Sequence, residues 1–132
     1  MKIKVLLALL TGFCGAYAMH ETCELNDGTP MVSKVVVAFG LNGLKGLMTE
    51  ARTNPEAHFA MLELHEKCQR SQWDKTPYLG QETHSTLRRH ALVTDELNPP
   101  HAMCEVIRNA LKCGSFGECK LVNPIRKCTS EE

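Results

Sequence analysis

The chain has 132 residues with 15 Lys and Arg against 15 Asp and Glu, so its formal net charge is zero. This balance argues against a nucleic-acid binder, because such proteins depend on a surplus of Lys and Arg facing phosphates. One tryptophan and two tyrosines are present, and so few aromatic residues predict a modest core. The length is that of one domain.

The first 18 residues have the pattern of a cleaved secretory signal peptide. An apolar run between Val5 and Gly15 follows two lysines, and Ala16-Tyr17-Ala18 places small residues before a cleavage site. The run is shorter than the roughly 20 apolar residues that a bilayer span needs. We therefore expect a secreted protein with a signal peptide over 1–18, a single cysteine-rich helical domain over 19–132, and no membrane span.

The cysteines of the mature chain are even in number, because Cys14 is removed with the signal. An even set in an oxidising compartment predicts three disulfides, each worth about 2–4 kcal/mol. The expected disulfide cysteines are Cys23, Cys68, Cys104, Cys113, Cys119 and Cys128.

The first expected helix follows Thr29-Pro30, a cap residue with proline at the first helical position. Apolar residues at helical spacing carry it from Met31 to about Arg52. Glycines at 40, 43 and 46 lie along one face, where a neighbouring helix could approach closely. Each glycine costs about 1 kcal/mol against alanine, so a helix broken near Gly40 is an equal alternative.

Two further helices are expected in the middle of the chain. Asn54-Pro55-Glu56 repeats the capping signal, and the apolar spacing that follows turns Cys68 toward the core. A weaker helix is expected from about Glu82 to Val93, with Leu87, Ala91 and Leu92 inward.

The clearest apolar stripe follows Asn98-Pro99-Pro100 and predicts a helix as far as Cys113-Gly114. With no convincing alternation of a strand anywhere, the expected fold class is all-α, a small disulfide-stapled bundle of four to five helices. Cys104 and Cys113 would lie about 13 Å apart along this helix, so they are not expected to pair. The other pairings stay open, with Cys68 a reasonable partner for one of the two.

Six histidines raise the question of a metal or catalytic site. His58 and His65 would lie about 10 Å apart along one helix, too far to share an ion. No nucleophile elbow, phosphate-binding loop or calcium loop is present. The sequence therefore predicts no catalytic residue, no cofactor and no metal.

Arg88-Arg89 is a dibasic pair that could be a processing site for a secretory-pathway protease. An ordinary solvated helix face is the simpler interpretation, and the sequence does not decide between them.

The function expected from these patterns is that of a secreted, non-enzymatic protein that binds an extracellular protein or receptor, as a toxin, effector or signalling ligand does. One alternative is a carrier that encloses a small apolar ligand in a cavity lined by residues such as Val36, Phe39 and Leu47. A small secreted hydrolase is the third possibility.

Overall fold

A computed structural model describes residues 21–69, 78–95, 98–115 and 117–129 of the chain. The expected signal peptide over 1–18 and most of the loop after residue 70 lie outside the described residues.

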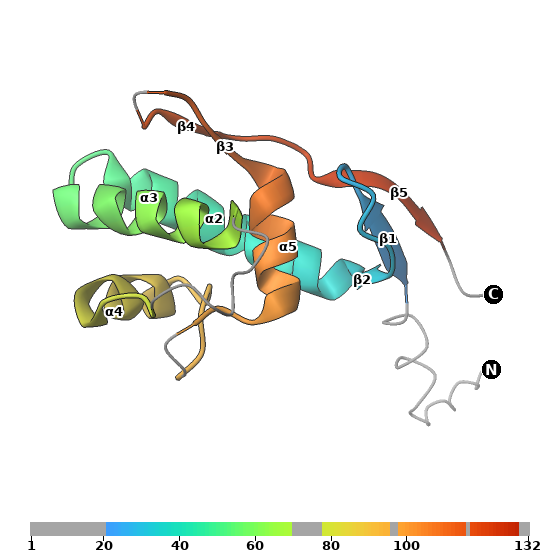
Figure 1. The fold of residues 1–132 in the computed structure, drawn as a ribbon, viewed down its shortest axis with the longest axis horizontal. Coiled ribbons are helices and arrows are strands. Elements are labelled where there is room, and N and C mark those ends of the chain that lie inside the picture. Colours follow the sequence, from blue (N-terminus) through green and yellow to red (C-terminus); the bar gives the residue numbers. More distant parts are fainter. Residues whose placement is uncertain (1–20, 70–77, 96–97, 116, 130–132) are drawn as a thin grey trace, which may run out of the picture.

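Four helices are described within these ranges: α2 (Lys34–Ala51), α3 (Pro55–Gln69), α4 (Gln81–Arg89) and α5 (His101–Ala110). Helices α2, α3 and α4 run along the long axis of the molecule, and α5 crosses them steeply (Figure 1). Helix α3 packs between α2 and α4, while α5 packs against both α2 and α3.

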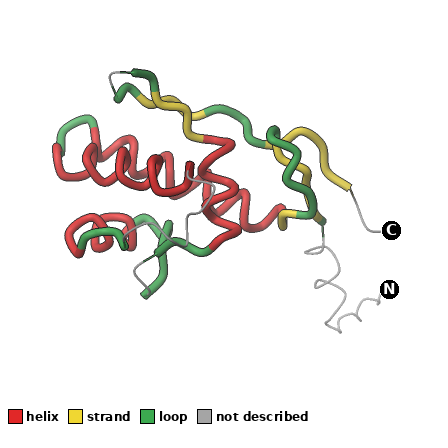
Figure 2. The backbone as a smooth tube through the Cα atoms, viewed as in Figure 1, coloured by secondary structure: helices red, strands yellow, loops and turns green. Residues whose placement is uncertain are grey.

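The expectation of an all-α bundle is wrong, because five short strands form two antiparallel sheets in the described part of the chain. One sheet has the order β2-β1-β5, with β1 at Thr22–Leu25, β2 at Val32–Ser33 and β5 at Ile125–Thr129. The other is the hairpin of β3 (Leu111–Cys113) and β4 (Cys119–Leu121). The strands lie along one edge and one end of the helical layer (Figure 2). Strands of two to five residues are too short for alternation to reveal them in the sequence.

Helix α2 begins later than expected, at Lys34, because Ser33 and not Thr29 is its N-cap. The Ser33 hydroxyl accepts a hydrogen bond from the Val35 backbone N–H at 3.2 Å. The helix continues unbroken through its glycines, so the alternative of a break near Gly40 is wrong. A Cβ built on Gly40 would lie 2.8 Å from a methyl carbon of Val106, which shows how closely α5 approaches this face.

Helix α3 begins where the sequence predicts. The side-chain oxygen of Asn54 accepts a hydrogen bond from the Glu56 backbone N–H at 3.0 Å. Its buried face includes Ala57, Met61 and Leu64 and ends at the fully buried Cys68.

Helix α4 ends at Arg89, four residues before the expected boundary. Ala91 has a φ of 60°, and the Leu92 N–H donates to the Leu87 carbonyl at 3.0 Å. These features form a left-handed cap of the Schellman type, with alanine where glycine is usual. Ala91 is exposed, contrary to expectation, whereas Leu87 and Leu92 are fully buried.

Helix α5 is the expected last helix, but it ends at Ala110 and the chain continues as strand β3. Leu111 has an extended backbone, and the Ala110 carbonyl accepts a hydrogen bond from the Val122 N–H at 2.8 Å. Cys113 therefore lies in a hairpin and not on the helix. Strand β4 provides the backbone hydrogen-bond partners of residues 111–113, which a longer α5 would have provided within the helix.

The core consists of two groups of buried residues. The larger lies among the four helices and includes Leu44, Leu64, Leu87 and Ile107, none of which has exposed surface. The smaller joins the three-stranded sheet to α2 and α5 through Leu25, Val32, Val37 and Val106.

Three disulfides join the six cysteines: Cys23–Cys128, Cys68–Cys104 and Cys113–Cys119. Two of them link directly opposed residues of antiparallel strands, β1 with β5 and β3 with β4. The third fixes α3 to α5. Cys104 and Cys113 are not paired with each other, although the reason differs from the expected one, since they do not share a helix.

The disulfide-bonded, cysteine-rich character expected from the sequence is thus present, and three disulfides fit a secreted or extracellular protein. None of the helices in the described ranges is both long enough and apolar enough to cross a membrane.

Candidate functional site

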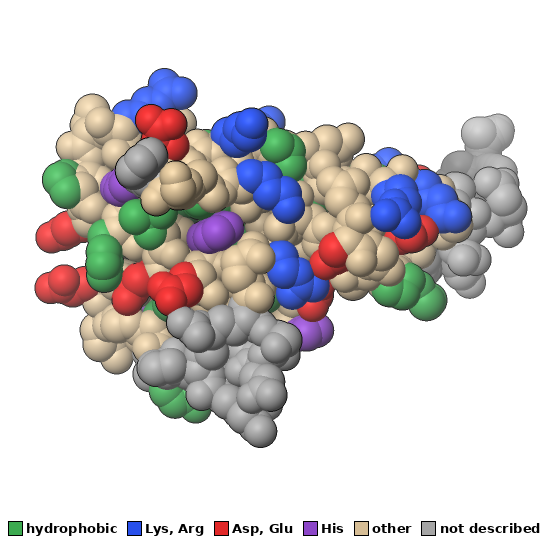
Figure 3. All heavy atoms as spheres, turned by 45° about the horizontal axis from the view of Figure 1, so that its top comes forward, with side chains coloured by type: hydrophobic (Ala, Val, Ile, Leu, Met, Phe, Trp, Pro, Cys, Tyr) green, Lys and Arg blue, Asp and Glu red, His purple; other side chains and the backbone are tan. Residues whose placement is uncertain are grey.

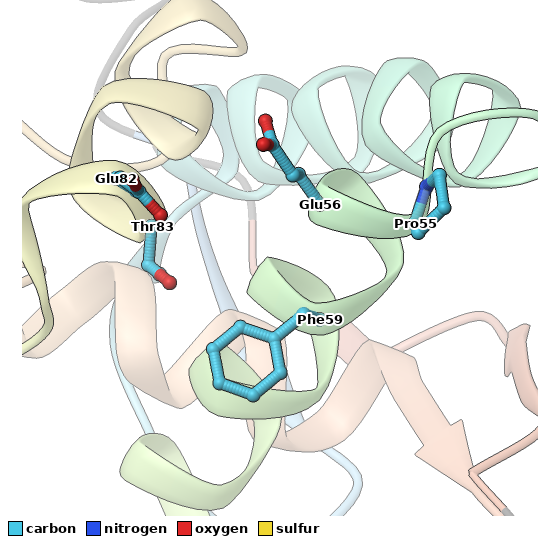
Figure 4. A pocket seen from close by; sticks show the side chains of 5 residues that line it. All are labelled: Pro55, Glu56, Phe59, Glu82 and Thr83. Carbon is cyan, nitrogen blue, oxygen red and sulfur yellow. The ribbon is translucent and has the colours of Figure 1, made fainter.

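A groove lies between the N-terminal half of α3 and the first turn of α4. It is lined by Pro55, Glu56 and Phe59 of α3 and by Glu82 and Thr83 of α4. Figure 4 shows the Phe59 ring extending from α3 toward the side of the groove that α4 forms. The carboxylate of Glu56 lies on one side of the ring and that of Glu82 comes from the opposite helix.

Local contacts fix the residues on both sides of the groove. Asn54 caps α3, and Pro55 fits its first position because an N–H is not needed there. On α4, the Thr83 hydroxyl donates a hydrogen bond to the Glu63 carboxylate of α3 and so fixes the two helices to each other. Thr83 is 5% exposed, which makes this contact a structural support beneath the groove.

Phe59 is the feature of the groove that packing does not explain, because its side chain is 57% exposed. The sequence analysis missed it, although a signal was available. Residues two apart on a helix differ in direction by about 200°, so Phe59 faces away from the stripe of Ala57 and Met61. An aromatic residue off the buried stripe is the pattern to look for.

Two carboxylates accompany this exposed ring. Glu56 and Glu82 form no ion pair with any residue in the described ranges. Each lies in the first turn of its helix, where a negative charge complements the helix dipole. Figure 3 shows acidic and hydrophobic side chains together at the end of the molecule where α3 and α4 lie.

The groove has a volume of about 220 Å³. Small-molecule sites usually enclose about 300–1,000 Å³, so this groove suits a protruding side chain better than a whole ligand. The residues named for a carrier cavity do not gather elsewhere: Leu47 is in the core, Val36 is half-buried, and Phe39 is 59% exposed.

A second polar cluster joins the C-terminal ends of α2 and α4. The Glu50 carboxylate accepts two hydrogen bonds from the Arg89 guanidinium, at 2.9 and 3.1 Å. It also lies 2.7 Å from the Nε2 atom of His90. The bonds from Arg89 and then His90 outweigh partial desolvation, with a further contribution from Asn54, and lower the pKa of Glu50 from 4.5 to about 2.

A histidine beside a carboxylate resembles half of a catalytic triad, but its surroundings favour a structural role. The Nε2 atom of His90 is engaged by Glu50, and its Nδ1 atom faces Gly46, where a Cβ would lie 2.9 Å away. The Nε2 atom is thus engaged by a hydrogen bond, and the Nδ1 atom packs against α2 at Gly46. General-base catalysis needs one of them within reach of a proton on a nucleophile or substrate.

Replacing Glu50 with glutamine is expected to change how stability depends on pH. Because the folded-state pKa is depressed, the folded protein binds fewer protons than the unfolded chain, and the carboxylate stabilises it above pH 4.5. This contribution is lost as the pH falls from 4.5 to about 2. Urea unfolding across this range should show a wild-type advantage over Glu50→Gln that disappears toward pH 2.

Glu118→Gln is the matched control, because Glu118 is exposed and outside any ion pair of the described chain. Its curve should run parallel to that of the wild type. If the curve of Glu50→Gln also ran parallel, the proposed depression of the Glu50 pKa would be wrong.

A third cluster ties the turn between β1 and β2 to α5. The Arg108 guanidinium contacts Asp27 at 2.8 and 3.0 Å and also donates to Glu105. Burial raises the pKa of Asp27, but hydrogen bonds from Thr29 and Arg108 outweigh it and hold the pKa well below its ordinary value. These groups satisfy one another, which favours a structural role for the cluster.

His58 and His65 both lie on α3, seven residues apart in the sequence. His58 and His65 are half-buried on α3, and the His65 Nε2 atom is 3.4 Å from the Gln69 amide. Desolvation and the charge of Lys112 lower the pKa of His65, against an opposing effect of Glu66. Within the described ranges, no three His, Cys, Asp or Glu residues gather in a metal-binding arrangement.

The dibasic pair forms the last turn of α4. Arg88 contacts Asp95 at 2.7 Å, and Arg89 is bound to Glu50. Cleavage there would need the last turn of α4 to unwind, although Leu87 and Leu92 on either side are fully buried. These contacts favour the interpretation as a solvated helix face over that as a processing site.

Comparison of the chain with protein-family models, curated proteins and solved structures finds no match, so the site is interpreted from its own geometry.

Proposed function

We propose that this is a secreted, non-enzymatic protein that binds an extracellular protein through the groove between α3 and α4. The observation that carries the proposal is the exposed Phe59 in a groove beside two carboxylates that form no ion pair with the described residues. The fitting partner presents a large apolar side chain flanked by Lys or Arg. A toxin, effector or signalling ligand acts through such contacts.

The chemistry of the groove supports this class of partner. An aromatic side chain in a small hollow is the kind of residue that dominates binding energies at protein interfaces. Carboxylates at the rim give specificity and accelerate association with a basic partner. The signal-like first 18 residues and the three disulfides support action outside the cell.

The two alternatives find less support in the described residues. A carrier would be supported by an enclosed apolar space, whereas this groove is small and its aromatic residue is exposed. The pair of His90 and Glu50 gives a hydrolase little support, because the His90 Nε2 atom is bound to Glu50 and its ring packs against Gly46.

Selection of displayed random peptides on the immobilised mature protein tests the proposal. The expected sequences contain a large apolar residue next to Lys or Arg. A synthetic peptide of that sequence should bind Phe59→Ala at least about ten-fold more weakly, the loss expected for truncating an interface anchor. Glu56→Gln with Glu82→Gln should weaken binding mainly at low salt.

Phe39→Ala is the matched control, because it removes an equally exposed phenylalanine from α2. It should leave the affinity unchanged, and both phenylalanine variants should melt like the wild type since each side chain lies largely in solvent. Selected peptides that bind Phe59→Ala as well as the wild type, or that lack basic residues, would overturn the proposal.

A further inference from the structure

The hairpin of β3 and β4 places two lysines directly opposite each other. Lys112 and Lys120 are partners in the antiparallel register, between the Leu111–Leu121 and Cys113–Cys119 pairs. Successive residues of a strand face opposite sides. The leucines and cysteines therefore face the protein, whereas both lysines are exposed.

This arrangement is unfavourable for the hairpin alone. Opposed residues of an antiparallel pair have Cβ atoms about 4.5–5.5 Å apart, and like charges at that distance destabilise the sheet. Neither lysine forms an ion pair with a carboxylate in the part of the chain that is described. Lys112 donates a hydrogen bond to the Arg108 carbonyl at the end of α5, at 3.2 Å. The Lys120 side chain makes no hydrogen bond with the described residues.

Strand β5 extends the positive charge beyond the hairpin. Arg126 and Lys127 are exposed. Both form ion pairs with the Glu24 carboxylate, Arg126 at 3.0 Å and Lys127 at 3.8 Å. We define Lys112, Lys120, Arg126 and Lys127 as the basic strip. Figure 3 shows Lys and Arg side chains distributed over the side of the molecule that carries the strands.

We propose that the basic strip binds a sulfated polysaccharide of the extracellular matrix or cell surface. Its cations lie on the hairpin and on β5, which follow one another along one edge of the molecule (Figure 1) and so fit a linear polyanion better than a compact anion. Three disulfides fit an extracellular protein, and sulfated polysaccharides are linear polyanions of that environment. Separate residues form the strip and the groove, so this inference does not rest on the proposed protein partner.

Other groups near the strip limit its charge. Glu118 lies with both hairpin lysines around a shallow hollow of about 360 Å³ at the Cys113–Cys119 disulfide. Glu24 partly neutralises the β5 end. The lysine pair of the hairpin is therefore the part of the strip where a sulfate group replaces repulsion with attraction.

Heparin is the probe for the test, with the mature disulfide-bonded protein in 0.15 M salt, where the Debye length is about 8 Å. Lys112→Gln with Lys120→Gln should weaken binding at least about ten-fold, or about 1.4 kcal/mol, since an exposed ion pair contributes about 0.2–1 kcal/mol. The control, Lys34→Gln with Lys45→Gln, removes the same charge from α2 and should change the affinity less than about two-fold.

The thermal melt of the hairpin variant should stay close to that of the wild type, because relief of the repulsion between directly opposed charges offsets the lost Lys112 bond to the Arg108 carbonyl. Chemically desulfated heparin should not bind. The proposal is overturned by absent heparin binding, by equal losses in the two double variants, or by tighter binding to single-stranded DNA or to phosphatidylserine vesicles than to heparin.

Discussion

Replacing Ile107 with alanine is expected to lower the free energy of unfolding by about 2–5 kcal/mol, the range for truncating a buried branched side chain. Ile107 lies in the middle of α5 and has no exposed surface. Helix α5 is held to α3 by the Cys68–Cys104 disulfide and packs against α2. The surroundings therefore have little freedom to close the cavity. Urea unfolding with circular dichroism measures the loss.

Ile125→Ala provides the comparison, because Ile125 is the same residue type but only half-buried, at the start of β5. Its loss should be well below that of Ile107→Ala, since part of the side chain already contacts water. Equal losses in the two variants would mean that the helical layer does not carry the main core.

Replacing Gly43 with alanine is expected to cost about 2 kcal/mol or more, although alanine in a helix normally gains about 1 kcal/mol over glycine. A Cβ on Gly43 would overlap the carbonyl oxygen of His90 and lie 2.9 Å from a methyl carbon of Leu92. The His90 carbonyl is part of the backbone and cannot rotate away. The turn after α4 and the buried Leu92 would therefore have to shift away from α2.

Gly46→Ala tests this reasoning on the same helix. Its new Cβ would meet the His90 ring at 2.9 Å, and a ring can turn aside where a carbonyl cannot. The loss should therefore be clearly smaller than for Gly43→Ala in the same unfolding experiment. A stabilised Gly43→Ala protein would show that α2 and the turn after α4 are not in contact at this position.

The helices were largely predictable from the sequence because their signals are local. The Asn54 cap and the apolar spacing up to Cys68 define α3 without reference to the rest of the chain. Boundaries were less predictable where a distant segment competes with the helix. Helix α5 stops at Ala110 because Val122 and strand β4 supply partners from further along the chain.

The strands could not be predicted for the same reason. Strand β1 has four residues and gains its partner β5 more than 100 positions away, through a register that no local pattern encodes. The groove at Phe59 and the basic strip differ in the same way, one having a local sequence signal and the other depending on strand pairing. Phe59 could have been found from its place off the apolar stripe of α3, whereas Lys112 and Lys120 become neighbours only in the hairpin.

The order in which the chain is made places a demand on its oxidation. During synthesis Cys23 emerges 105 residues before its partner Cys128. Cys68 emerges earlier than Cys128 and is therefore available to the Cys23 thiol first; a bond between these two would have to be resolved by thiol–disulfide exchange. Until the last strand arrives, β1 has an unpaired edge facing β5's place in the sheet. A chain that stops short of Cys128 would leave the Cys23 thiol without its partner and β1 without β5 at one end of the sheet.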